Sequence, residues 1–324
     1  MKKWLSVLLF ITVMTVLAAC GTSNNTSGTA NNGSGDNGNG DSGSEVATLT
    51  IEHELGTTEV SKSPEKVVVF DFGILDSLDQ MDVEVAGVPQ ANIPPYLSKY
   101  EDSKYENVGS LKEPDFEKIS EINPDLIIIS GRQAESYDEL SKIGPTIFLG
   151  VDTNDYLNSF TKNMETLGEI FEQEEFIQQQ LATVKESIEA LKEKATALNK
   201  NALIVLANEG NISAYGAGSR FGIIHDEFGF TPVDAGIEVS THGMNVSFEY
   251  ILEQDPDYLF VIDRGAAVAG ESSAKQTVEN AIVEKTKAYQ NGNIVYLDPN
   301  YWYLSGGGLT SVQEMVKEIE GSIK

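Results

Sequence analysis

The sequence contains one segment twice, and this internal repeat constrains the fold more than any other feature. The first copy runs from Phe116 to Arg132 and the second from Phe248 to Arg264. Phe, Glu, Ile, Pro, Asp and Arg recur at a constant offset of 132 residues, without a gap. Such a repeat predicts two lobes of similar architecture.

Each copy predicts a short helix, a Pro-Asp turn, a buried strand and an arginine just past the strand. Asp115 and Ser247 stand where helix N-caps belong, and the proline ends the helix because it disfavours helical backbone in the preceding residue. The apolar run that follows suits a strand covered on both faces of a parallel sheet. Ligands bind beyond the carboxyl ends of such strands, where Arg132 and Arg264 are expected. The alternative is that the repeat reflects only a common structural pattern without a shared function, since Pro-Asp before a strand is common.

Strand and helix patterns alternate through the rest of the chain, which indicates sheets flanked by helices. Apolar residues at helical spacing between 156 and 199 predict a long helix, and twenty-five helical residues would span roughly 38 Å. We therefore expect an α/β fold with two Rossmann-like lobes joined by a long, rigid bridging helix that restricts hinge closure. The expected domains are a signal peptide over 1–19, a lipidated cysteine and disordered linker over 20–46, an N-terminal α/β lobe over 47–170, the bridging helix over 171–200 and a C-terminal α/β lobe over 201–324.

The N-terminus has the pattern of an export signal. Lys2 and Lys3 precede an apolar run that ends in small residues and is too short for a confident membrane span. The run Leu17-Ala18-Ala19-Cys20 resembles the lipobox of bacterial lipoproteins, in which the cysteine is lipid-modified. Cys20 is the only cysteine, so an intrachain disulfide and a Cys-based metal site are excluded. We expect a lipid anchor on Cys20 that tethers the protein to the outer face of the cell membrane, as in Gram-positive-type lipoproteins.

The charge composition limits the partners. A formal net charge of −28 argues against nucleic acid and against an anionic membrane surface. Of the 22 lysines and arginines only three are arginines, namely Arg132, Arg220 and Arg264. The planar guanidinium suits a bound anion better than the point charge of lysine does, so three converging arginines predict a ligand with several negative charges. The alternative is that these arginines pair with nearby acids such as Asp263.

These features together resemble a known family. The lipobox, the two lobes, the bridging helix and the repeat are similar to the ABC-transporter substrate-binding proteins for iron siderophores and cobalamin, which have the class III periplasmic-binding-protein fold with a helical backbone. Four shorter runs resemble the ferric catecholate branch, with its petrobactin- and enterobactin-type receptors: Ser219–Asp226, Thr241–Gly243, Val261–Arg264 and Tyr301–Leu304. The resemblance implies that Arg132, Arg220 and Arg264 line a cleft and hold an anionic iron–catecholate.

The same resemblance implies roles for five further residues. His242 and Tyr303 would complete the iron shell when the ligand supplies only four donors, since Fe(III) prefers hard oxygen donors; with a six-donor ligand they would only border the pocket. Trp302 is expected beside the ligand, where it would report binding by fluorescence. Glu117 and Glu249 would dock the permease, one on each lobe. A structural reason also exists for both glutamates, because a carboxylate in the first helical turn gains ~0.3–1 kcal/mol from the helix dipole.

We therefore expect a non-catalytic, lipid-anchored and monomeric receptor that captures a ferric catecholate siderophore and delivers it to an ABC importer. Petrobactin-type ligands are the first choice, and no cofactor is expected beyond the Fe(III)-siderophore that is transported. One alternative keeps the transport role with haem, a hydroxamate siderophore or cobalamin, although a neutral ligand would not need three arginines. A surface hydrolase is the distant alternative, and no Gly-x-Ser-x-Gly or HExxH motif supports it. Three histidines in total also argue against a His-rich zinc or manganese site.

Overall fold

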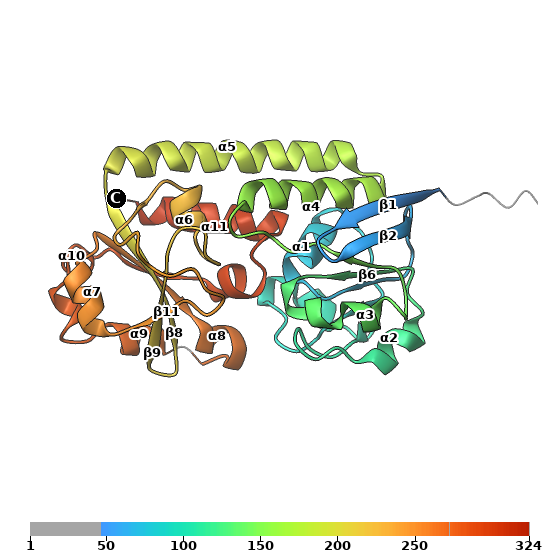
Figure 1. The fold of residues 1–324 in the computed structure, drawn as a ribbon, viewed down its shortest axis with the longest axis horizontal. Helices are drawn as coiled ribbons and strands as arrows, with labels where there is room; N and C mark the ends of the chain where they lie inside the picture. Colours follow the sequence, from blue (N-terminus) through green and yellow to red (C-terminus); the bar gives the residue numbers. More distant parts are fainter. Residues whose placement is uncertain (1–46, 272, 324) are drawn as a thin grey trace, which may run out of the picture. The chain divides into compact units, whose positions relative to one another are not determined.

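The computed structural model describes residues 47–271 and 273–323. The predicted signal peptide, the linker and Cys20 lie outside these residues. Within the described ranges, no helix combines the length and apolar character that crossing a bilayer requires. Two separate sheets dominate the described part, one built from residues before 150 and the other from residues after 200 (Figure 1).

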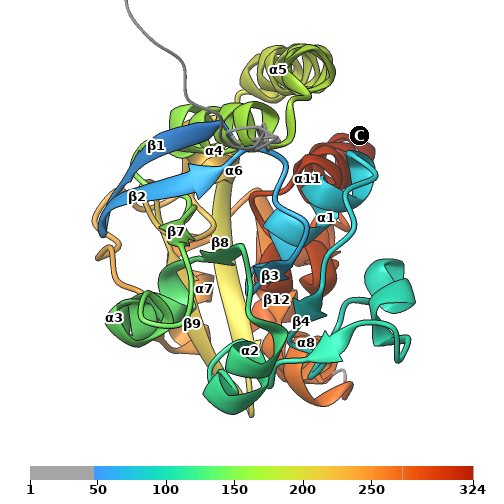
Figure 2. The same cartoon turned by 90° about the vertical axis from the view of Figure 1, so that its right-hand side faces the viewer.

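The first sheet is entirely parallel and has the strand order β5-β4-β3-β6-β7. Every residue of strand β6, which pairs between β3 and β7, is buried, as the run of apolar residues predicted. Its strands are β3 (Val67–Val69), β4 (Gly87–Val88), β5 (Glu106–Asn107), β6 (Leu126–Ile129) and β7 (Thr146–Phe148). Its helices are α1 (Phe72–Gln80), η1 (Pro95–Glu101), α2 (Phe116–Ile122), η2 (Gly131–Ser136) and α3 (Tyr137–Leu140). An antiparallel hairpin of β1 (Thr48–His53) and β2 (Gly56–Ser61) packs beside β7 (Figure 2).

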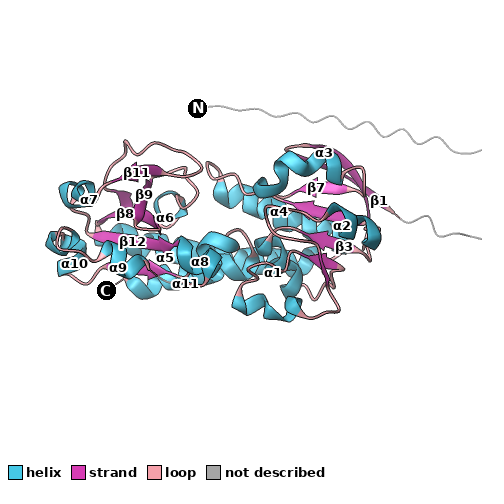
Figure 3. Ribbon diagram, turned by 90° about the horizontal axis from the view of Figure 1, so that it is seen from below, coloured by secondary structure: helices cyan, strands magenta, loops and turns pink. Residues whose placement is uncertain are grey.

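The second sheet is mixed, with the strand order β11-β9-β8-β12-β13 and β10 paired to β8. Strand β8 pairs in parallel with β10 and β12, and β12 pairs in parallel with β13. Strand β9 pairs antiparallel with both β8 and β11. The strands are β8 (Asn201–Asn208), β9 (Asn211–Tyr215), β10 (Thr231–Pro232), β11 (Met244–Val246), β12 (Tyr258–Asp263) and β13 (Ile294–Leu297). The helices are α6 (Ile223–Asp226), α7 (Phe248–Gln254), α8 (Arg264–Ala269), α9 (Ala274–Val278), η3 (Val283–Lys285) and α10 (Lys287–Gln290). Figure 3 shows the two sheets side by side.

The two repeat copies fold alike, as α2–β6 and α7–β12. The Asp115 side chain accepts from the backbone N–H of Lys118 at 3.1 Å, and Ser247 accepts from that of Tyr250 at 3.3 Å, so both predicted N-caps are present. Both helices end on a left-handed residue before the proline, with φ of 52° at Asn123 and 44° at Asp255. The predicted helix, turn and strand are therefore confirmed in both copies.

The long helical stretch breaks once, between α4 (Tyr156–Phe171) and α5 (Glu174–Leu198). Helix α5 has 25 residues and runs along both lobes (Figure 1). It buries one stripe at helical spacing: Ile177, Leu181, Val184, Ile188, Leu191 and Ala195. This stripe belongs to a single hydrophobic cluster that also contains Leu126 of the first sheet and Phe260 of the second. A continuous core thus links the lobes, while the exact domain boundaries stay a prediction.

The chain ends by returning to the first lobe. After β13 it forms a π-helical turn, η4 (Asn300–Leu304), and then α11 (Leu309–Ser322). Helix α11 packs against α5 and also against α1 of the first lobe. The segment between β13 and α11, which carries Trp302 and Tyr303, therefore lies where the two lobes meet.

Candidate functional site

A cavity of about 540 Å³ is lined by residues of both lobes. This volume lies within the roughly 300–1,000 Å³ typical of small-molecule sites. The first lobe contributes Asp71, Lys112, Ser130 and Arg132; α4 contributes Tyr156; the second lobe contributes Arg220, Phe221, Thr241 and His242; and η4 contributes Trp302 and Tyr303. Arg132 follows the carboxyl end of β6 and faces this cavity, as its place beyond the strand predicted.

The three arginines meet at one residue, Tyr303. Arg132 and Arg220 each donate from Nη2 to the Tyr303 carbonyl oxygen, at 2.8 and 2.6 Å. Arg264 donates from Nε to the Tyr303 phenol oxygen at 3.0 Å and from Nη1 to Asn208 Oδ1 at 2.9 Å. Arg264 does not line the cavity, so its connection to the site runs through Tyr303. Arg132 and Arg220 face the cavity themselves.

The electrostatics of this cluster favour an anion. Burial lowers the pKa of Arg220, and the charge of Arg132 lowers it further; an arginine nevertheless stays charged at neutral pH. The guanidinium carbon of Arg220 lies 4.2 Å from the ring centre of Tyr303. Burial by itself raises the pKa of Tyr303, but the charges of Arg220 and Arg264 outweigh it, so the pKa lies below its usual value. A bound anion would relieve the repulsion between the arginines.

A tight turn positions Arg220. Gly218 has a φ of +68°, a left-handed conformation that favours glycine. Its N–H donates to Asp226 Oδ2 at 2.7 Å, and the neighbouring Ser219 hydroxyl donates to the Gly216 carbonyl at 2.5 Å. These bonds turn the chain sharply after β9 and direct Arg220 to the cavity.

The predicted imidazole and phenol also border the cavity. His242 is exposed in the loop between β10 and β11, and Tyr303 is half-buried. In the described part of the chain, no group of three or more His, Cys, Asp or Glu side chains is placed to hold a metal ion. Iron ligation by His242 and Tyr303 would thus require a chelate that supplies the other donors, and it stays a prediction.

Trp302 is fixed by the closing helix. Its side chain is buried, and its Nε1 donates to Glu318 Oε2 of α11 at 2.8 Å. Glu318 also accepts from the backbone N–H of Asp298 at 2.9 Å, so α11 holds the whole turn after β13. Trp302 lines the cavity and is therefore suited to report binding.

Three lining residues carried no sequence signal. Lys112 is exposed in the cavity wall, but nothing in the sequence distinguishes it from the other lysines. Asp71 places a carboxylate there and caps α1 by accepting from the N–H groups of Gly73 and Ile74 at 2.8 and 3.0 Å. The buried hydroxyl of Tyr156 has no hydrogen-bond partner among the described residues.

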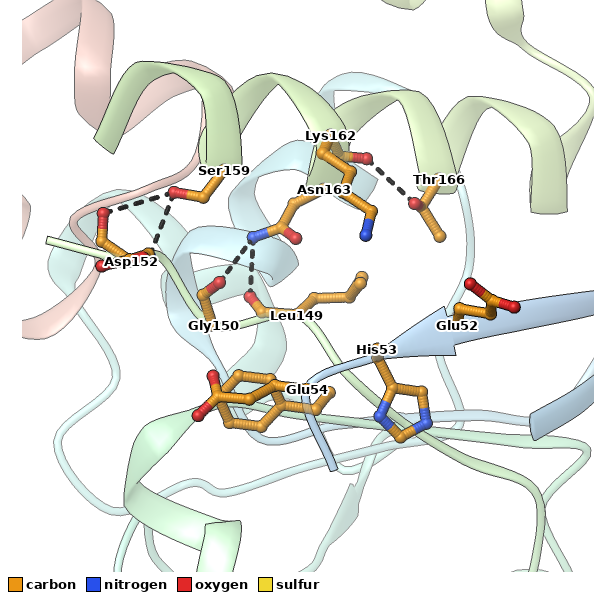
Figure 4. Close-up of a pocket in the computed structure, with 11 residues that line it drawn as sticks. Glu52, His53, Glu54, Leu149, Gly150, Asp152, Ser159, Lys162, Asn163 and Thr166 are labelled. Atoms are coloured by element: carbon orange, nitrogen blue, oxygen red, sulfur yellow. Dashed lines mark hydrogen bonds between the residues drawn. The ribbon is translucent and has the colours of Figure 1, made fainter. Parts of the chain in front are cut away.

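A second, smaller cavity of about 150 Å³ lies between the β1–β2 hairpin and α4 (Figure 4). Its wall is held by Asn163, whose Nδ2 donates to the carbonyls of Leu149 and Gly150, both at 3.0 Å. Its size suits water better than a chelate, and we interpret it as a packing gap. His53 lies here, whereas His225 is buried and bonded through Nδ1 to the Phe230 carbonyl at 2.9 Å.

Two α/β lobes on a long shared helix, with a cationic cavity where they meet, define a bilobal solute-binding protein. The chain belongs to the periplasmic binding protein family, whose family model matches residues 67–301. The petrobactin-binding protein YclQ of Bacillus subtilis is 51% identical over 330 residues, which cover 100% of both chains. The putative ABC transporter substrate-binding lipoprotein YhfQ of the same organism is 27% identical over 340 residues, again covering 100% of both chains.

Solved structures give the same result. The crystal structure of YclQ superposes with a TM-score of 0.84 at 53% identity, covering 86% of this chain and 99% of that chain. The catecholate-siderophore binding protein VctP of Vibrio cholerae superposes with a TM-score of 0.82 at 38% identity, covering 85% and 100%. The predicted family and fold class are thereby confirmed. The names of these relatives describe binding proteins and not enzymes.

Proposed function

We propose that this protein is a receptor that binds a ferric catecholate siderophore, of the petrobactin type in the first instance, and delivers it to an ABC importer. The observation that carries the proposal is the convergence of Arg132, Arg220 and Arg264 on Tyr303 beside the large cavity. All the arginines of the chain are used in this one place.

The ligand chemistry fits this cluster. A ferric catecholate chelate carries several negative charges on its phenolate oxygens, and guanidinium groups donate strong, charge-assisted hydrogen bonds to such oxygens. In the present structure, a carbonyl and a phenol oxygen of Tyr303 accept from the arginines. Catecholate oxygens are stronger acceptors of the same kind. A neutral ligand such as cobalamin gives no reason for this arrangement.

The relatives favour the same ligand class. YclQ is named a petrobactin-binding protein, and its sequence is 51% identical to this chain over the full length of both. VctP is named a catecholate-siderophore binding protein. Petrobactin-type chelates are therefore the first ligands to test, ahead of other ferric catecholates.

Delivery to a permease is supported by two exposed carboxylates. Glu117 and Glu249 lie in the first turns of α2 and α7, the corresponding helices of the two lobes. Neither takes part in an ion pair within residues 47–271 and 273–323. We propose that they bind basic groups of the permease, while a lipid on Cys20 holds the protein, as a monomer, on the outer face of the membrane.

A titration panel tests the proposal. Tryptophan fluorescence is followed while ferric petrobactin, the ferric complex of a simple catecholamide, a ferric hydroxamate, haem and cobalamin are added separately. We expect saturable quenching at micromolar concentrations with the two ferric catecholates and little with the others. Quenching by the hydroxamate, haem or cobalamin, but not by the catecholates, would reassign the ligand. An absence of binding to all five would overturn the transport role.

A further inference from the structure

A buried carboxylate outside the cavity holds the segment that carries Trp302 and Tyr303. Asp76 of α1 is only 1% exposed. Its Oδ1 accepts from the backbone N–H of Thr310 at 3.1 Å, and its Oδ2 accepts from that of Ser311 at 3.0 Å. These are N–H groups of the first turn of α11, which have no partner within the helix. Asp76 of the first lobe thus binds the start of the last helix of the chain.

This contact replaces a missing helix cap. The N-cap position of α11 is Gly308, which has no side chain to bind the N2 and N3 amides as a capping residue does. A Cβ at Gly308 would collide with Asp76 Oδ1 and with the Gly73 carbonyl oxygen. The glycine therefore admits Asp76, and Asp76 supplies the capping carboxylate from another element.

Through Tyr96, the same carboxyl group also reaches the middle of the segment. The Tyr96 hydroxyl lies 3.1 Å from Asp76 Oδ2 and 2.7 Å from Ser305 Oγ, and Ser305 Oγ lies 2.6 Å from the Asn300 carbonyl oxygen. In addition, Ser77 Oγ accepts from the Leu309 N–H at 3.0 Å. Residues 300–309 are therefore tied to groups of the first lobe at Ser305 and at Leu309, and Ser305 in turn holds the Asn300 carbonyl.

A count of the protons available for hydrogen bonds indicates that Asp76 is protonated. The chain from Asp76 through Tyr96 and Ser305 to the Asn300 carbonyl has three contacts, but its two hydroxyls supply only two protons. All three contacts become hydrogen bonds when the Asp76 carboxyl carries the third proton and donates it to Tyr96. Burial raises the pKa of Asp76 to about 7, which agrees with this assignment.

The described titratable residues that face Asp76 include no cation that would favour its ionised form. These are phenols: Tyr96 of η1, Tyr156 of α4 and Tyr301 of η4. From α11, the groups that face Asp76 are the backbone amides of Thr310 and Ser311. A protonated carboxyl can still accept from both amides, one on each oxygen, while it donates to Tyr96.

We propose that Asp76, together with Tyr96, is a positioning residue for the ligand site: it fastens the segment of residues 300–309 to the first lobe and so holds Tyr303 between the arginines. This inference rests on the proposed function, since it assigns a role within that binding site. Asp76 does not line the cavity, so it acts on the ligand only through the segment. The segment leaves the second sheet at Leu297, whereas its far end is bonded to Asp76 of the first lobe. These bonds to Asp76 therefore help to set the distance from Tyr303 to Arg220 and Arg264 of the second lobe.

Matched variants on the same helix test the proposal. Asp76→Asn places an NH₂ donor against one of the two α11 amides and breaks the capping. Asp79→Asn is the control, because Asp79 is on α1 and accepts from the Tyr100 hydroxyl at 3.0 Å but makes no hydrogen bond to α11 among the described residues. Tyr96→Phe and Tyr100→Phe form a second matched pair. Each full-length variant is examined by amide hydrogen exchange of residues 298–311, and by its Kd for the ferric complex of a simple catecholamide.

We expect Asp76→Asn and Tyr96→Phe to speed exchange in residues 298–311 and to weaken ligand binding about tenfold, the loss of one well-placed hydrogen bond. Asp79→Asn and Tyr100→Phe are expected to leave both readouts near wild type, even where they lower the melting temperature. Equal effects of the two pairs, or a lowered melting temperature with unchanged exchange and Kd in Asp76→Asn, would overturn the proposal. If wild type binds no ferric catecholate, the proposed function fails, and the exchange data still decide whether Asp76 fastens the segment.

Discussion

The Arg264 guanidinium donates from Nε to the phenol oxygen of Tyr303 at 3.0 Å. Arg264 begins α8 directly after β12, within the second lobe. Tyr303 belongs to a segment that is tied to the first lobe through Asp76 and Tyr96. Together with the bond from Arg220 to the Tyr303 carbonyl, this bond joins the second lobe to the segment. Arg264 can therefore affect ligand binding through Tyr303, although it does not line the cavity.

Tyr303→Phe removes the acceptor of that bond. We expect the free energy of unfolding to fall by about 1 kcal/mol and the affinity for a six-donor ferric catecholate to change little. With a four-donor chelate we expect a larger loss of affinity and a changed visible absorption spectrum of the complex, because a tyrosinate ligand of Fe(III) would be missing. Tyr301→Phe is the control, since Tyr301 packs on Tyr96 and not on the arginines. An unchanged spectrum with the four-donor chelate would exclude iron ligation by Tyr303.

Single arginine substitutions are expected to differ in effect. Arg132→Gln and Arg220→Gln each remove a charged donor that faces the cavity, and we expect affinity to fall about 10- to 100-fold, the range for one charge-assisted hydrogen bond. Arg264→Gln acts only through Tyr303 and is expected to cost less. Isothermal titration with a ferric catecholate gives the order directly. A larger loss in Arg264→Gln than in Arg220→Gln would show that the ligand contacts Arg264 itself.

Asp76 is expected to make stability depend on pH. Its pKa is raised by burial from 3.8 to about 7, so the folded state holds this proton more tightly than the unfolded state. The resulting stabilisation is present in full below pH 3.8 and is lost as pH rises through about 7. The shift corresponds to roughly 4 kcal/mol. Urea unfolding between these pH values should therefore show the advantage of wild type over Asp76→Asn shrinking as pH rises; a constant difference would mean that Asp76 is ionised throughout.

Tyr156→Phe is expected to stabilise the protein. The buried hydroxyl has no hydrogen-bond partner in the described part of the chain, and leaving such a group unsatisfied costs about 1 kcal/mol or more. Thermal unfolding should thus shift upward, whereas Tyr100→Phe, which loses a 3.0 Å bond to Asp79, should shift it downward. A loss of ligand affinity in Tyr156→Phe would instead show that the ligand uses this hydroxyl.

The two predicted docking glutamates are expected to affect transport but not binding. Reversing the charge in Glu117→Lys and Glu249→Lys should reduce uptake of radiolabelled ferric siderophore by cells, while the Kd of the purified protein stays unchanged. Glu121→Lys is the control: Glu121 lies on the same helix as Glu117, at its other end, and pairs with Lys118 at 2.8 Å. Equal uptake in all variants would leave only the helix-dipole role for Glu117 and Glu249.

Much of the fold could be predicted because its signals are local. The N-caps at Asp115 and Ser247, the prolines after the helices and the apolar runs each act within a few residues, and the structure has the predicted elements in both copies. Helix α5 follows its apolar stripe from Glu174 to Leu198. The convergence of the arginines could be anticipated from their scarcity and their places in the chain.

Other features depend on contacts between distant residues, and these have no local signal. The antiparallel pairing of β9 and β11 is decided by the sheet as a whole. In the sequence, nothing distinguishes Asp76 from other acidic residues on helices. Its role depends on contacts with Thr310 and Ser311 of α11, which lie more than 230 residues later in the chain. Arg264 was expected to line the cavity like the other two arginines, but in the structure it bonds to the Tyr303 phenol, and Tyr303 lines the cavity in its place.

The most direct test of the account is the affinity of a variant in which Arg132, Arg220 and Arg264 are all replaced by Gln. Titration of this variant and of wild type with one ferric catecholate, beside thermal unfolding of both, separates binding from folding. We predict that the variant retains a cooperative melting transition close to that of wild type and shows no saturable binding. Binding that persists at wild-type affinity in the folded variant would contradict the claim that these three guanidinium groups hold the ligand.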